Sequence, residues 1–478
     1  MPKRDTVRDN LWTLGATEAL RLLNEGRITA EALAASCLDR IAAVEPKVRA
    51  FAFLDQERAL ADARECDRRR KAGLPTGPLF GLPVGVKDII DVAGTPTEFG
   101  SPLHRGRRPR RDAVLVARLR SAGAVVFGKT VTTEFAYFTP GPTRNPRDFD
   151  RTPGGSSSGS AAAVAAAMLP LAIGTQTNGS MIRPASFCGV FGLKPSHGLI
   201  PRTGVLNLSE TLDTVGGYGR SLADVALLID ALSGHDAGDP ATAPEPGPRL
   251  AEYLATAPRL KPRLAFVETP RWSEAEPDTK AGFAELIEVL GDAVLRVELP
   301  PWFAGAWDAQ RIIMHSEMAH NLKAEYQRGR PQAGDTRMSD RLAQLIEEGR
   351  DLRAADYLQA LALQRALRAE LAELFTSFDA ILTPAAPGQA PVGMATGSPV
   401  FCTPWSLAGT PAVSLPILTG AGGLPIGVQM VGGVGEDARL LATARWVLDA
   451  VTSPERPGKA AGGKVAGATT RRKAKPVQ

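Results

Sequence analysis

Two polar turns rich in glycine and serine carry the hydroxyl groups best placed to do chemistry. They are TPGGSSSGS at residues 152–160 and GTQTNGS at residues 174–180. Between them lie SAAAVAAAM, typical of a buried helix, and an apolar strand over residues 169–173. Glycines at both ends of such a helix-strand unit allow a close approach of the backbone to a substrate. The residues alone leave three interpretations open: a linker, a helix cap or the wall of an active site.

A serine in such a site needs a base, because its hydroxyl attacks poorly until a proton is removed. None of the histidines lies in a comparable motif, so we interpret them as surface or packing residues: His104, His197, His235, His315 and His320. Lysine can serve instead where its surroundings keep it neutral. Lys87 ends the apolar run GLPVGV, where loss of water favours the uncharged amine. A surface ion pair with the neighbouring Asp88 is the simpler alternative.

The segment GAVVFGKT at residues 123–130 matches the pattern of a nucleotide-binding phosphate loop. In such a loop the strand precedes the motif, and small residues let backbone N–H groups wrap a phosphate. Here Ala124, Val125, Val126 and Phe127 have the character of the strand itself. We therefore expect no nucleotide site in this segment.

Composition limits the classes of protein. The 478 residues, 44% hydrophobic and 22% charged, predict a large folded core. Much of the positive charge lies in residues 454–478, a segment poor in large apolar residues that we expect to be a disordered tail. The longest apolar run, residues 161–173, is shorter than a membrane span. Without a signal segment, and with scattered cysteines (Cys37, Cys66, Cys188 and Cys402), we expect a cytoplasmic protein without a metal site.

The elements that position these residues follow from the apolar pattern. Residues 29–46 predict a helix that Thr29 caps and Pro46 ends. Residues 339–375 predict a long helical segment, beyond a Pro/Gly-rich connection that starts at Gly234. Short apolar runs closed by glycines predict buried strands within residues 79–94, 122–130, 168–176, 378–387 and 423–432. Strands that alternate with helices predict an α/β fold.

Several segments, in the same order along residues 10–450, resemble the amidase signature family. They are GPLFGLPVGVKDIIDVAGTPT, RLRSAGAVVFGKTVTTEFA, TRNPRDFDRTPGGSSSGSAAAVAA, GTQTNGSMIRPASFCGVFGLKPS, FDAILTPAAP, AGTPAVSLPI and GLPIGVQMVG. The resemblance implies one large α/β domain, a twisted mixed β-sheet covered by helices on both faces. The expected division is a helical segment 1–75, a catalytic domain 76–452 and a basic tail 453–478.

The resemblance also implies a catalytic triad of Lys87, Ser156 and Ser180. Ser180 would be the nucleophile, and Ser156, held on a cis peptide, would pass its proton to neutral Lys87. The oxyanion donors would be the backbone N–H groups of the turn that leads into the nucleophile: Thr177, Asn178 and Gly179. No metal or organic cofactor is implied.

This chain departs from the family around the nucleophile. Many members have D-T-G-G-S-I-R where this chain has Q-T-N-G-S-M-I-R, so Arg183 lies three residues after Ser180 instead of two. Backbone donors survive such changes, and we expect them to alter specificity. The candidate substrate contacts are Arg183, Tyr137, Phe138 and Thr139. Arg183 either binds a carboxylate on the acyl side of the substrate or fixes the turn structurally.

We therefore expect an amidohydrolase that cleaves a C–N bond of a small linear amide, carbamate or urea-like molecule rather than a peptide bond. It would form an acyl-enzyme on Ser180 and release ammonia or an amine. The alternatives are the glutaminase (A) subunit of a tRNA-dependent amidotransferase and a non-enzymatic binding module. The expected partner is a small-molecule substrate, with neither nucleic acid nor membrane, and a homodimer stays open.

Overall fold

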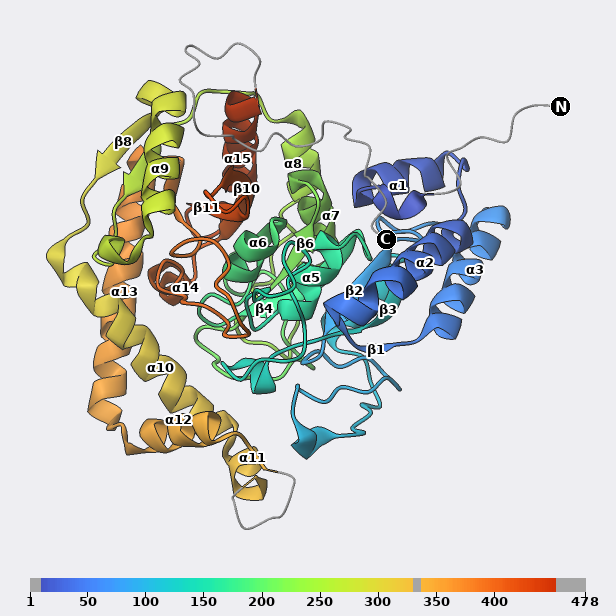
Figure 1. The fold of residues 1–478 in the computed structure, drawn as a ribbon, viewed down its shortest axis with the longest axis horizontal. Helices are drawn as coiled ribbons and strands as arrows, with labels where there is room; N and C mark the ends of the chain where they lie inside the picture. The colour runs from blue at the N-terminus through green and yellow to red at the C-terminus, as the bar shows by residue number, and fades with distance from the viewer. Residues whose placement is uncertain (1–9, 330–336, 453–478) are drawn as a thin grey trace.

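One mixed sheet organises the molecule. The computed structural model describes residues 10–329 and 337–452, so the predicted tail 453–478 lies outside the described residues. The sheet has 11 strands in the order β1-β3-β2-β4-β6-β5-β10-β11-β9-β7-β8, with helices packed around it (Figure 1). This arrangement confirms the predicted α/β fold.

The strand nearest the proposed base, β2, lies between two parallel neighbours, β3 and β4. β7 pairs in parallel with β8 and β9, and the remaining pairs are antiparallel. The strands are β1 (Phe51–Leu54), β2 (Pro83–Lys87), β3 (Val125–Thr130), β4 (Leu171–Gln176), β5 (Phe191–Lys194), β6 (Thr214–Gly219), β7 (Leu264–Val267), β8 (Val294–Val297), β9 (Ala380–Pro384), β10 (Ala412–Thr419) and β11 (Pro425–Val431).

Helices surround the sheet and also extend from it. In Figure 1, α1 to α3 lie beside β1 to β3, and α10, α12 and α13 form a helical group on the opposite side of the molecule. The helices are α1 (Ala16–Asn24), α2 (Ala30–Val48), α3 (Gln56–Lys71), α4 (Val114–Ser121), α5 (Ser158–Ala165), α6 (Ile182–Cys188), α7 (Leu222–Leu232), α8 (Leu250–Thr256), α9 (Pro277–Leu290), α10 (Ala306–Asn321), α11 (Lys323–Arg328), α12 (Asp340–Asp351), α13 (Ala354–Ser377), α14 (Thr403–Ala408) and α15 (Asp437–Thr452).

Two glycines of β6 show that helices cover both faces of the sheet. Successive residues of a strand point to opposite faces. A Cβ at Gly216 would lie 2.7 Å from the sulfur of Met181, at the start of α6. A Cβ at Gly217 would lie 2.7 Å from Leu228 of α7. The sheet is therefore sandwiched between α6 and α7, and neither position has room for a side chain.

Two predicted helix boundaries are wrong. The helix that Thr29 caps runs past Pro46 to Val48, because a proline in the last turn removes only one hydrogen bond. The segment 339–375 is two helices, α12 and α13. The chain is extended at Arg353, whose guanidinium binds Asp356 in the first turn of α13.

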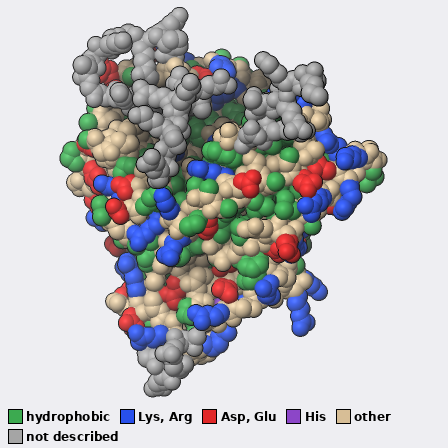
Figure 2. Space-filling model, turned by 45° about the vertical axis from the view of Figure 1, so that its right-hand side comes forward, with side chains coloured by type: hydrophobic (Ala, Val, Ile, Leu, Met, Phe, Trp, Pro, Cys, Tyr) green, Lys and Arg blue, Asp and Glu red, His purple; other side chains and the backbone are tan. Residues whose placement is uncertain are grey.

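The surface and the helices give no sign of a membrane span. No helix in the described part of the chain is long and apolar enough to cross a bilayer. Figure 2 shows basic and acidic side chains intermixed over the face that it draws, with hydrophobic side chains between them.

Candidate active site

Lys87 ends β2 and is completely buried, with 0% of its surface exposed. Its Nζ lies 2.7 Å from the hydroxyl oxygen of Ser156 and 2.7 Å from that of Thr175. Burial lowers the pKa of Lys87 to about 7, while the negative charge of Asp213 acts in the opposite direction. The neutral amine is therefore populated near neutral pH, as a general base requires.

The serine run is a buried structural junction rather than a linker. The hydroxyl of Ser157 donates to the backbone oxygen of Thr175 at 3.1 Å, and that of Ser160 donates to Ile173 at 2.8 Å. These bonds fasten the start of α5 to β4. They hold Ser156 between the two elements, and the Gly155–Ser156 peptide bond is cis.

Ser180 lies in the turn between β4 and α6, close to the serine run. The backbone N–H of Ser157 donates to the backbone oxygen of Ser180 at 3.3 Å. Ser156, Ser180 and the preceding turn, residues 177–179, line one pocket. The structure thus brings the three proposed triad residues and the proposed oxyanion turn to one place.

The turn before Ser180 is held by its side chains. The side-chain oxygen of Gln176 accepts hydrogen bonds from the backbone N–H groups of Met181 and Ile182, at 2.8 and 3.0 Å. Gln176 thereby occupies the start of α6 as the acid of the more usual motif could, because both offer an acceptor oxygen. The amide nitrogen of Asn178 donates to Gln310 of α10. Among the described residues, none accepts a hydrogen bond from the backbone N–H groups of Asn178 and Gly179, which leaves both free to bind a substrate oxygen.

Arg183 is a buried cation on the wall of the pocket. It is 3% exposed, and its Nη2 donates to the backbone oxygen of Gly155 at 2.6 Å. Its Nε and Nη1 have no hydrogen-bond partner in the described part of the chain. Burial lowers the pKa of Arg183 to about 10, so it stays charged at neutral pH. This charge therefore forms no ion pair with a described acidic residue.

The comparisons with known proteins agree with this geometry. The family model described as "Amidase" matches residues 32–441, most of the chain. The chain belongs to the amidase family. This confirms the resemblance inferred from the sequence motifs.

Relatives within and around the amidase family differ in their named activities. The chain is 36% identical to a glutamyl-tRNA(Gln) amidotransferase component, the A subunit from Salinispora arenicola, covering 94% of this chain and 99% of that one. A solved chain from work on the origins of an s-triazine catabolic enzyme superposes with a TM-score of 0.84 at 32% identity, covering 91% of this chain and 98% of that one. The peptide amidase of Stenotrophomonas maltophilia gives a TM-score of 0.79 at 30% identity, covering 93% and 98%.

The predicted substrate contacts of this amidase-family chain are only partly brought together. Tyr137 and Phe138 line the same pocket as Ser180. Thr139 does not: its hydroxyl pairs with that of Ser339 at 2.9 Å, and it lines a separate hollow. Thr139 points away because the chain turns at Pro140, so adjacency in sequence did not carry into the pocket.

Sequence reasoning missed the apolar part of the pocket. Met314 and Met318 come from α10, Leu208 from the loop before β6, and Pro399 from the loop before α14. The spacing of the two methionines marks one face of a helix. It could not indicate what that face covers, because α10 lies more than a hundred residues beyond Ser180. Thr175 was also missed, although it is the second hydroxyl at Lys87.

Neither the phosphate-loop match nor the histidines contribute to the pocket. Lys129 of the GKT sequence is completely buried and pairs with Asp88 at 3.0 Å, so it cannot reach a phosphate. No histidine is among the described residues that line the pocket. Among the described residues, no group of three or more His, Cys, Asp or Glu side chains could hold a metal ion.

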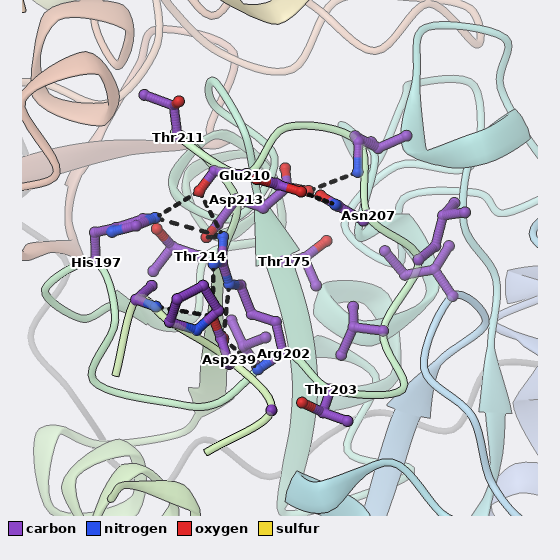
Figure 3. A pocket seen from close by; sticks show the side chains of 18 residues that line it. Thr175, His197, Arg202, Thr203, Asn207, Glu210, Thr211, Asp213, Thr214 and Asp239 are labelled. Atoms are coloured by element: carbon purple, nitrogen blue, oxygen red, sulfur yellow. Dashed lines mark hydrogen bonds and ion pairs between the residues drawn. The ribbon is translucent and has the colours of Figure 1, made fainter. Parts of the chain in front are cut away.

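A second cavity, of about 420 Å³, lies behind the proposed base (Figure 3). Thr175 lines it from the side of Lys87, and Leu208 borders both this cavity and the pocket at Ser180. Figure 3 shows Arg202 between Asp239, with which it forms an ion pair at 2.8 Å, and the loop that carries Asp213. The proposed base is thus enclosed by a catalytic pocket on one side and a polar cavity on the other.

Proposed function

We propose that the chain is an amidohydrolase that cleaves a C–N bond of a small linear amide, carbamate or urea-like substrate through an acyl-enzyme on Ser180. The observation that carries this proposal is the contact of 2.7 Å between a fully buried Lys87 and Ser156, in a site where no acid forms an ion pair with the lysine. A buried amine without an acid partner loses its proton readily and acts as a base.

The reaction follows from this arrangement. Neutral Lys87 accepts the proton of Ser156, which in turn takes the proton of Ser180 as its oxygen attacks the carbonyl carbon. The carbonyl oxygen becomes an oxyanion, and the backbone N–H groups of Asn178 and Gly179 stabilise it. The same protons then pass back to the leaving nitrogen, and the C–N bond breaks.

Deacylation uses the same residues in reverse. Water enters where the amine has left, and Ser156 and Lys87 take its proton as its oxygen attacks the acyl carbon. The bond between the acyl carbon and Ser180 then breaks, and the proton returns to the serine oxygen. The products are a carboxylic acid, or a carbamic acid from a urea, and ammonia or an amine.

The pocket limits the acyl group. Met314, Met318 and Leu208 give it apolar walls, whereas Arg183 adds one positive charge with unpartnered N–H groups. A buried charge without a partner is costly, and an acceptor on the substrate would offset that cost. We therefore propose that Arg183 receives a carboxylate or other acceptor group on the acyl side, besides holding the backbone at Gly155.

A glutaminase subunit of a tRNA-dependent amidotransferase is the second candidate. The names of the curated relatives favour it, and they give no support to the expectation that nucleic acid is not a partner. The composition of the pocket favours the first candidate. Free glutamine carries an ammonium group beside its carboxylate, and no acidic side chain lies among the described residues that line the pocket.

The test combines one variant with a substrate panel. Ser180→Ala should lose all hydrolysis of anilides, primary amides, carbamates and half-amides without a change in melting temperature, because it removes the covalent route alone. Ser158→Ala, in the same buried run, is the matched control and should keep its activity. Full turnover by Ser180→Ala would refute the proposal.

Gel filtration with an ammonia assay separates the two candidates. The lone chain should hydrolyse simple amides at full rate in the fraction where it elutes. Hydrolysis of glutamine only, and only after a partner subunit is added, would establish the amidotransferase component instead.

A further inference from the structure

We propose that Asp213 is a positioning residue for the reaction at Ser180: it locks the oxyanion turn to the wall of the catalytic pocket and supplies the anion that faces Lys87. The proposal rests on the proposed function. Asp213 lies in the loop just before β6 and was not among the residues that the sequence motifs indicated.

The carboxylate of Asp213 joins two segments of the chain. One oxygen accepts a hydrogen bond of 2.5 Å from the hydroxyl of Thr177. The other accepts from the backbone N–H groups of Leu208 and Ser209, at 2.8 and 3.0 Å. Both oxygens thus serve residues that border the site.

Both segments touch the reacting atoms. Thr177 begins the turn whose backbone N–H groups face the substrate carbonyl, and Leu208 lines the pocket at Ser180. A displacement of about 1 Å in such a turn is enough to misplace oxyanion donors and slow the chemical step. A carboxylate that fixes Thr177 and Leu208 relative to each other therefore has a direct effect on the reaction.

The loop beyond Asp213 is anchored in turn. The hydroxyl groups of Ser209 and Thr211 both donate to Glu317 of α10, as does that of Tyr357 of α13 at 2.7 Å. Asp213 is therefore the point where an otherwise rigid loop is joined to the oxyanion turn.

The charge of Asp213 acts on Lys87 across the hydroxyl of Thr175. It is the charged group that raises the pKa of Lys87 against the larger, lowering effect of burial. The other charged groups around Asp213 are Arg202, whose Nη1 donates to its backbone oxygen at 3.2 Å, and Glu210 and Asp239 on the cavity wall. Arg202 is neutralised by its pair with Asp239 (Figure 3), so Asp213 is the carboxylate that Lys87 senses.

A fluorophosphonate tests this proposal without knowledge of the substrate. The oxygen of Ser180 bonds to phosphorus, fluoride leaves, and the serine proton passes to Ser156 and Lys87, so the labelling rate reports the same base and the same oxyanion turn. The rate of labelling of Ser180 is measured against pH for the full chain and for Asp213→Asn, Thr177→Val and Glu210→Gln.

The variants separate the two effects of Asp213. Asp213→Asn should lower the labelling rate at high pH about tenfold or more and move the acid limb to lower pH, because loss of the anion lowers the pKa of Lys87. Thr177→Val should lower the rate without moving the limb. Glu210→Gln, which removes a charge from the same cavity without touching the turn, should match the wild type in both.

Two results would overturn the inference: an Asp213→Asn profile identical to that of the wild type, or an equal shift of the limb in Glu210→Gln. If Asp213→Asn does not fold, a wild-type labelling rate in Thr177→Val overturns it. These results differ from failure of the proposed function, in which Ser180 of the wild-type chain takes no label at any pH.

Discussion

Two lysines on neighbouring strands, Lys87 of β2 and Lys129 of β3, are both completely buried, yet their surroundings differ. Lys129 faces the carboxylate of Asp88 at 3.0 Å and the hydroxyl of Thr97 at 2.7 Å. Lys87 faces two hydroxyls and no carboxylate within contact distance. The comparison shows that burial alone does not create a base. A base arises where burial is combined with neutral acceptors, whereas a carboxylate turns the same residue into an ion pair.

The largest expected effect is on catalysis. Lys87→Met should lower turnover by about a thousandfold or more, because it removes the base that activates both serines. The folded state should survive, since methionine fills a similar volume and carries no charge. Steady-state kinetics together with a thermal melt measure this. Near-normal turnover in a folded Lys87→Met protein would break the comparison.

Lys129→Met should act on stability instead. It leaves the carboxylate of Asp88 buried without its cation, which typically costs about 3 to 5 kcal/mol of unfolding free energy. The remaining folded protein should keep its turnover per active site. Chemical denaturation followed by kinetics on the folded fraction checks this, and Lys129→Met together with Asp88→Leu should recover part of the loss. Retained stability with lost turnover would mean that Lys129, too, takes part in the reaction.

Arg183 sharpens the comparison as a third buried cation. Arg183→Met should lower kcat/KM selectively for half-amides with an acyl-side carboxylate, by about 2 to 3 kcal/mol, and spare neutral amides. Equal losses on both substrate types would leave only its bond to the backbone of Gly155. A fall in melting temperature that accounts for the loss would lead to the same conclusion.

The smallest expected effect is on the pH dependence of stability. The pKa of Lys87 in the folded chain, about 7, lies below its ordinary value of 10.5. Between these values the unfolded chain binds more protons than the folded one, so the stability that this site contributes rises with pH. Lys87→Met should flatten that rise between about pH 7 and the upper end of the range. An unchanged slope would mean that Lys87 is protonated in the folded chain.

The sequence predicted the core of the sheet well, because buried parallel strands such as β2, β3 and β4 have continuous apolar runs closed by glycines. It failed at helix boundaries, where one side-chain contact such as that between Arg353 and Asp356 decides where a helix restarts. Local pattern does not encode such a contact.

The site divides in the same way. Lys87, Ser156 and Ser180 lie in motifs with distinctive glycines and serines, so the motifs placed them. Asp213 and the methionines of α10 are typical of an ordinary loop and an ordinary helix. Only the fold brings them to Ser180, through contacts between segments that are tens to more than a hundred residues apart.

The claim that Lys87 is the base is tested most directly by the pH profile of fluorophosphonate labelling at Ser180. The profile is measured in the wild type, in Lys87→Met and in alanine variants of each histidine. The account predicts a single ionisation near pH 7 in the wild type, its persistence in every histidine variant, and the loss of labelling in Lys87→Met. Labelling that persists with the same ionisation in Lys87→Met, or that disappears in a folded histidine variant, would contradict it.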